Sequence, residues 1–237
     1  MALRLDARLP WGLPAAIGGA WLLLAVGAVT GSRALDHDAV FGSGRADWVA
    51  VGLFLLGWEV MVAAMMLPAA LPAVRQLVAR RFGIAAFLAG FGAVWAAFGW
   101  TALSFDSLVH RTVDALPWLT ARPQLVAAAL LGLVGLLQLA PLTEPCLRAC
   151  RSWVPTGGDG PARRGRFVDG LHYGGLCAGC DGALMLLMFG VGRGNFAWMV
   201  AVAMVMATQR AEWVVPTIHR WIGVAALVLG LAVVVAG

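Results

Sequence analysis

Cysteines, methionines and an aspartate stand together inside an apolar stretch, where their types and spacing favour binding of a soft metal ion. The stretch GLCAGCDGALMLLMFG covers residues 175–190 and holds Cys177, Cys180, Asp181 and Met188. At about 100° per residue, a helix places these four side chains within one arc. Thiolate and thioether sulfurs together suit Cu(I), and thiolates also suit Zn(II). Because ionisable residues within apolar spans are rare and usually functional, we favour a metal site here over simple packing.

A second thiol pair precedes this stretch in the segment LQLAPLTEPCLRACRSW. Pro145 can start a short helix at its first position, which would place Cys146 and Cys150 on one face, four residues apart. Arg148 and Arg151 would favour the thiolate forms of these cysteines. We therefore expect Cys146 and Cys150 to be further metal ligands.

Other side chains could complete the site. Met61 and Met65 are neighbours on one face of a predicted helix in GWEVMVAAMMLPAALP, and His172 precedes Cys177 in the later segment. Glu59 and Glu212 are further polar residues within predicted spans, and a purely structural ion pair is an equal alternative for Glu212. A zinc site would recruit Asp181 and His172 around the thiolates, whereas a copper site would recruit the methionines.

The composition indicates an integral membrane protein. Of the 237 residues, 61% are hydrophobic and 12% are charged, whereas soluble domains average about 45–50% and 25%. The mean hydropathy is +0.85. All basic residues are arginines that stand between apolar stretches, so the net charge of +5 indicates orientation in a membrane rather than nucleic-acid binding. Two close cysteine pairs do not resemble the disulfide framework of a small secreted domain.

The pattern predicts an all-α polytopic bundle that forms one integral membrane domain over residues 1–237. Each predicted span is near the roughly 20 residues that cross a bilayer. The first span is too long for the apolar core of a signal peptide, so we expect a retained helix. Pro68 and Pro72 should kink the second span. The crowded junction of the last two spans leaves six spans as the alternative to seven. The seven predicted spans cover residues 11–30, 47–71, 83–105, 122–142, 169–191, 195–213 and 219–236.

The distribution of arginine predicts the orientation. With a cytoplasmic N-terminus, the inner segments hold twelve of the 17 arginines and the outer segments hold five. Because cytoplasmic loops of membrane proteins carry an excess of basic residues, this bias predicts a multi-pass protein of the bacterial inner membrane with the N-terminus inside. Both cysteine pairs then lie toward the cytoplasm.

Four segments give the chain a family resemblance: MVAAMMLPAALP, QLAPLTEPCLRACRS, GLHYGGLCAGCDGALMLLMFGVG and NFAWM followed by Glu212. The chain resembles the predicted metal-binding integral membrane proteins of bacteria, a family sometimes labelled copper-related. The family has Gly-Cys-Cys where this chain has Gly179-Cys180-Asp181, and Glu-Lys where it has Glu212-Trp213. The resemblance implies metal binding, with the family's third sulfur ligand either replaced by an oxygen ligand or lost.

Three functions compete at this stage. The first is an inner-membrane protein that binds copper, with zinc as the alternative, and moves it or exchanges it with a donor or acceptor protein. The second is a thiol–disulfide oxidoreductase that passes electrons from the two cysteine pairs to a quinone. The third is an assembly subunit whose polar residues hold helices together, which the GxxxG-like pair Gly175 and Gly179 would support. We favour the first, expect lipids but not nucleic acid as partners, and find no motif that indicates an enzyme.

Overall fold

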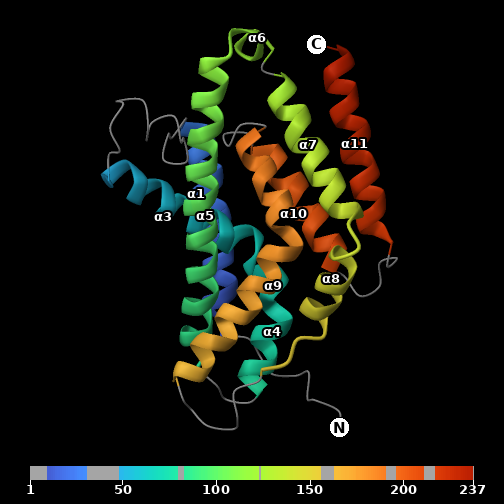
Figure 1. Cartoon of the computed structure of the whole chain (residues 1–237). Coiled ribbons are helices and arrows are strands. Elements are labelled where there is room, and N and C mark those ends of the chain that lie inside the picture. The colour runs from blue at the N-terminus through green and yellow to red at the C-terminus, as the bar shows by residue number, and fades with distance from the viewer. Residues whose placement is uncertain are drawn as a thin grey trace.

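The computed structural model describes residues 10–30, 48–79, 83–122, 124–155, 163–190, 196–210 and 217–236. Every regular element in these ranges is a helix, so the predicted all-α class is confirmed (Figure 1). The helices are α1 (Gly12–Thr30), α3 (Trp48–Met65), α4 (Leu67–Ala79), α5 (Ile84–Ala115), α6 (Pro117–Thr120), α7 (Gln124–Leu139), α8 (Thr143–Arg151), α9 (Arg163–Gly190), α10 (Phe196–Arg210) and α11 (Ile218–Ala236).

Each of the seven predicted spans overlaps one of the longer helices, although α5 continues past the predicted end to Ala115 and α9 begins before the predicted start, at Arg163. Not all of these helices are long enough to cross a membrane. Within the described residues, five are long and apolar enough by themselves: α1, α3, α5, α9 and α11. Helices α7 and α8 pass the same test only as a pair, and their axes are bent by 68°, so the number rises to six if this pair is one broken span. Helix α10 is apolar but shorter.

The second predicted span breaks where its prolines begin. Helix α3 ends at Met65, and α4 starts at Leu67 with Pro72 inside it. Pro68 and Pro72 have no N–H to donate, so each removes one hydrogen bond from the helical ladder. The break is confined to Met66, whose N–H still donates to the Val62 carbonyl at 2.7 Å. The predicted kink is confirmed, and it leaves Met66 between two helices.

Helix α9 is the most deeply buried of the five long helices, and its most extensive contact is with α5. Glycines allow the two backbones to touch. A Cβ atom on Gly170 would lie 2.1 Å from the Phe87 carbonyl oxygen, and one on Gly90 would lie 2.1 Å from the Phe167 carbonyl oxygen. Helices α7 and α11, which run side by side in Figure 1, approach in the same way through Gly135 and Gly223.

These glycines are not the GxxxG-like pair that the sequence suggested. A Cβ on Gly175 would meet nothing within 4 Å among the residues that the structure describes. A Cβ on Gly179 would lie 3.2 Å from Cys146 Sγ, so this glycine faces the short helix α8 rather than a long neighbouring helix. Close packing of the bundle therefore depends on other glycines, and Gly179 has a local role beside a cysteine.

We predict that Gly170→Ala destabilises the protein whereas Gly175→Ala does not. The new methyl group at position 170 would collide with backbone atoms of α5, which cannot rotate away, and overpacking of this kind costs about 1–3 kcal/mol. The matched change at position 175 enters open space and should gain about 0.5–1 kcal/mol from better helix propensity. Thermal unfolding of the two variants in detergent measures the difference, and equal midpoints would contradict the close α5–α9 packing.

Candidate metal centre

The short helix α8 begins directly after a bend that the local sequence imposes. Pro141 cannot continue α7, which ends at Leu139. The Thr143 hydroxyl donates to the Leu137 carbonyl at 2.5 Å and so caps the last turn of α7. The chain then turns by 68° into α8, and this bend brings α8 against the side of α9.

Helix α8 is amphipathic, as its pattern predicted. Leu147 and Cys150 are buried and Cys146 is half-buried, whereas Arg148 is exposed and pairs with Glu144 at 2.7 Å. The helix starts at Thr143, so the predicted start at Pro145 is two residues too late, whereas the helix itself and its cysteine-bearing face are confirmed. Its two thiols therefore point at α9 rather than at solvent.

Three thiols meet where α8 touches α9. The Cys180 thiol donates to Cys146 Sγ at 2.8 Å, and the sulfurs of Cys180 and Cys150 are 3.3 Å apart. All three sulfurs lie within 4.8 Å of one another, and this is the one group of three or more His, Cys, Asp or Glu side chains in the described ranges with metal-binding spacing. We call Cys146, Cys150 and Cys180 the three-thiol centre.

The absence of a side chain at Gly179 allows this approach. Cys146 Sγ lies over that glycine, and the thiol also donates to the Leu176 carbonyl at 3.2 Å. Leu147 and Leu176 pack around the sulfurs and form a small apolar cluster with them. Cys150 and Cys180 are therefore buried among aliphatic side chains of both helices, whereas Cys146 remains half-buried.

Cys177 is not part of the three-thiol centre. We expected Cys177 and Cys180 to point at one spot, but Cys180 faces α8 while Cys177 faces Met66 and α10. Its Sγ atom lies 3.9 Å from Met66 Sδ, and Arg210 Nη2 donates to it at 2.8 Å. The Cys-x-x-Cys pair is therefore divided between two neighbouring groups of side chains.

Arg210 connects the side chains of this second group. Its Nε donates to Asp181 Oδ2 at 2.9 Å, its Nη2 contacts the same oxygen, and its Nη1 donates to the Tyr173 hydroxyl at 3.3 Å. The Arg210 and Asp181 side chains are only 7% and 0% exposed. Asp181 thus lies in a buried ion pair instead of joining the three thiols. Its ligand role remains a prediction.

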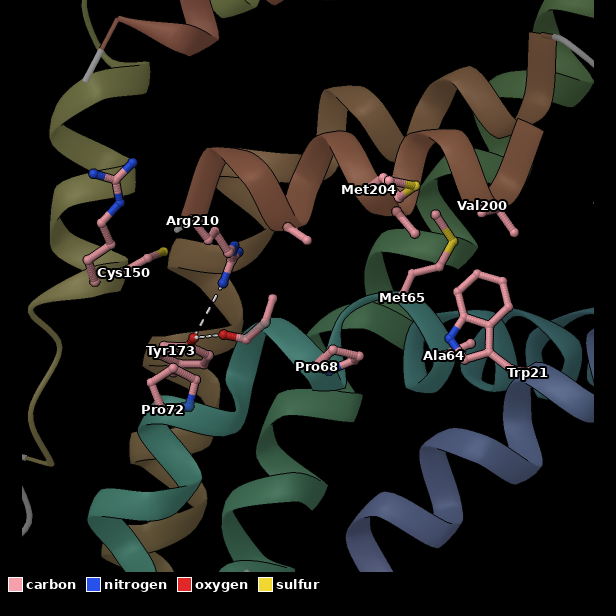
Figure 2. A pocket seen from close by; sticks show the side chains of 14 residues that line it. Trp21, Ala64, Met65, Pro68, Pro72, Cys150, Tyr173, Val200, Met204 and Arg210 are labelled. Atoms are coloured by element: carbon pink, nitrogen blue, oxygen red, sulfur yellow. Dashed lines mark hydrogen bonds between the residues drawn. The ribbon is translucent and has the colours of Figure 1, made fainter. Parts of the chain in front are cut away.

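A cavity of about 730 Å³ runs beside both groups. Figure 2 shows Cys150, Arg210 and Tyr173 near one end and Met65, Met204 and Trp21 near the other. Helices α1, α4, α8, α9 and α10 all contribute to its lining. The cavity thus leads from a methionine-bearing region to one sulfur of the three-thiol centre.

The remaining predicted ligands lie away from the three-thiol centre. Met61, Met65 and Met188 are buried in the apolar core, and Met65 also lines the cavity. His172 is exposed, and its Nδ1 accepts a hydrogen bond from Trp153 at 3.3 Å. Glu59 is half-buried on α3. Glu212 lies outside the described residues, and the ligand roles of the three methionines and His172 remain predictions.

Met66 and Tyr173 were not among the predicted ligands, and Arg210 was expected to neutralise a carboxylate without Asp181 being identified as its partner. Which sulfur Met66 faces depends on the packing of α9 against the break between α3 and α4, and the local pattern does not show this. The better signal for the ion pair was the presence of one buried carboxylate and one arginine on neighbouring spans. Such charges are rarely buried unless they are paired.

The fold and the three-thiol centre define a helical protein with apolar helices and a buried thiol cluster suited to a soft metal ion. The profile of the PpoB2 family, described as a copper chaperone family, matches residues 55–233. The match includes all four cysteines and well over half of the chain, so the chain belongs to the PpoB2 copper chaperone family. No curated protein and no solved structure matches the chain significantly.

Proposed function

We propose that this protein is a multi-pass protein of the bacterial inner membrane that binds Cu(I) at the three-thiol centre and passes it to an acceptor protein. The observation that carries the proposal is the convergence of Cys146, Cys150 and Cys180 within 4.8 Å. Membership of a copper chaperone family supports copper as the ion and a donor or acceptor protein as the partner.

The donor set of the three-thiol centre suits Cu(I) better than Zn(II). Structural zinc sites are almost always tetrahedral with four ligands, whereas soft thiolate ligands favour Cu(I). The metal-binding group in the described part of the chain offers three sulfurs and no carboxylate or imidazole. Metal–sulfur bonds of about 2.3 Å would place sulfurs about 3.8–4.0 Å apart. The hydrogen-bonded sulfurs would therefore separate modestly on binding, which small side-chain rotations could provide.

A thiol oxidoreductase is the second candidate, because the sulfurs of Cys146 and Cys180 are 2.8 Å apart. In this reaction two thiols would join as a disulfide, and two electrons and two protons would pass to a quinone. Incubation of the reduced protein with a soluble ubiquinone analogue tests it by mass spectrometry. A Cys146–Cys180 disulfide that forms in step with quinol would favour this function over copper delivery.

We predict that Cys180→Ser lowers the affinity for Cu(I) by about 100-fold or more. Loss of a side chain that only orients a metal ligand lowers metal affinity by about 10–100-fold. Cys180 is itself a proposed ligand and contacts both other sulfurs, so its loss should lower the affinity at least as much. Competition with a colorimetric Cu(I) chelator on the reduced, detergent-purified protein measures the affinity of the tightest site. Zn(II) binding should be weaker than Cu(I) binding in the unaltered protein.

The matched control is Ala149→Ser, which adds the same hydroxyl to α8 beside Cys150 and removes no sulfur. This variant should keep the affinity of the unaltered protein. If Cys180→Ser binds Cu(I) as tightly as Ala149→Ser does, the three-thiol centre is not the copper site.

The proposed orientation places the loop between α8 and α9 in the cytoplasm. In a variant with the four native cysteines replaced by serine, a cysteine introduced at Gly158 should resist a membrane-impermeant maleimide in intact cells. A cysteine introduced at Ser43, in a segment expected outside, should react. Labelling at position 158 but not at position 43 would reverse the orientation and place the thiols on the oxidising side, as the oxidoreductase requires.

A further inference from the structure

We propose that Cys177 and Met66 form a second Cu(I) site, separate from the three-thiol centre, with Asp181 as a third donor. The inference rests on the proposed function because it assumes that the protein handles Cu(I). It extends that function by giving a role to the second group of side chains, which does not share a sulfur with the three-thiol centre.

The spacing of the two sulfurs already matches a bound ion. Cys177 Sγ and Met66 Sδ are 3.9 Å apart. Two metal–sulfur bonds of about 2.3 Å at a trigonal or tetrahedral angle place their sulfurs about 3.8–4.0 Å apart. Both residues are fully buried, with 0% exposure. Met66 stands at the break between α3 and α4 and Cys177 stands on α9, so an ion between them would join separate helices.

The environment of Asp181 is a second observation, independent of the sulfur spacing, that indicates a bound ion. Its side chain is fully buried, and its Oδ1 atom has no hydrogen-bond partner among the described residues. Asp181 follows Cys177 by four residues on α9, which places the carboxylate on the same face as the thiol. Its Oδ2 binds the same guanidinium that donates to Cys177 Sγ. The carboxylate therefore shares Arg210 with Cys177, and its Oδ1 is the buried oxygen that would complete a three-coordinate site.

Charge balance favours a monovalent ion at this place. Arg210 and Asp181 neutralise each other, with side chains 7% and 0% exposed. A Cu(I)–thiolate pair is also neutral, so the occupied site would leave no uncompensated charge in the interior. A divalent ion would leave one positive charge buried, which is strongly unfavourable. Thioether sulfur is also a soft ligand that suits Cu(I), so charge and donor type agree.

Neighbours of the second site line the same cavity as the three-thiol centre, whereas its three donors do not line it. Arg210 and Tyr173 line the end of the cavity that Cys150 also lines (Figure 2). An ion held by Cys177 and Met66 would lie beside Arg210, which lines the cavity together with Cys150.

The test is the number of Cu(I) ions bound by the reduced, full-length protein in detergent, measured by titration against a colorimetric Cu(I) chelator. The unaltered protein should bind two ions, and Cys177→Ser should bind one. Met66→Leu should still bind the tight Cu(I) ion, but its affinity for the second ion should fall by about 10-fold or more, because leucine keeps the volume of methionine but lacks the sulfur. The matched control Met199→Leu changes another buried methionine, on α10, and this variant should still bind two ions.

Serine replacement of Cys146, Cys150 and Cys180 together separates this inference from the proposed function. The triple variant should retain one ion, and adding Cys177→Ser should remove it. If Cys177→Ser still binds the tight Cu(I) ion, this variant is folded. If Cys177→Ser does not fold, Met66→Leu tests the second site in its place. The second site would be overturned if Cys177→Ser and Met66→Leu both still bind two Cu(I) ions. It would also be overturned if the triple variant is folded and binds no Cu(I). Two ions in the triple variant would instead overturn the three-thiol centre.

Discussion

The approach of α8 to α9 over Gly179 is the constraint on which the candidate metal centre depends. Thiols on two helices can share one ion only if the backbones are separated by little more than two cysteine side chains. The bend of 68° between α7 and α8 turns the short helix toward α9, and the missing side chain at Gly179 admits Cys146 Sγ. A larger residue at position 179 would move Cys146 away and leave the three sulfurs without a common point.

Charged side chains are also buried near the contact between α8 and α9, and they form ion pairs. Arg210 neutralises Asp181, and Arg166 pairs with Asp169 at 2.8 Å near the start of α9. Buried pairs contribute little net stability, but loss of one partner is costly because it strands a charge. Helix α9 therefore positions thiols and at the same time depends on α10 for the neutrality of its carboxylate. Arg210 on α10 also donates to Tyr173 on α9, whose hydroxyl contacts the Ala69 carbonyl on α4. The packing of these three helices therefore affects the metal-binding side chains.

Composition and local pattern were sufficient to predict the helical class, the kink at the prolines and the amphipathic cysteine face of α8. These features follow from hydrophobicity, from the missing N–H of proline and from helical period, all of which act locally. The sequence also indicated that the cysteines belong to a metal site. It could not show that Cys180 joins Cys146 and Cys150 while Cys177 turns to Met66, because this division depends on how α8 and α10 pack on two sides of α9.

The most direct test of the three-thiol centre is X-ray absorption at the copper edge, in a Cys177→Ser background loaded with one equivalent of Cu(I). The account predicts three sulfur neighbours at about 2.3 Å and no nitrogen or oxygen neighbour, because three thiolates supply the whole donor set. A spectrum dominated by nitrogen or oxygen donors, or one that is unchanged when Cys180 is also replaced by serine, would contradict it.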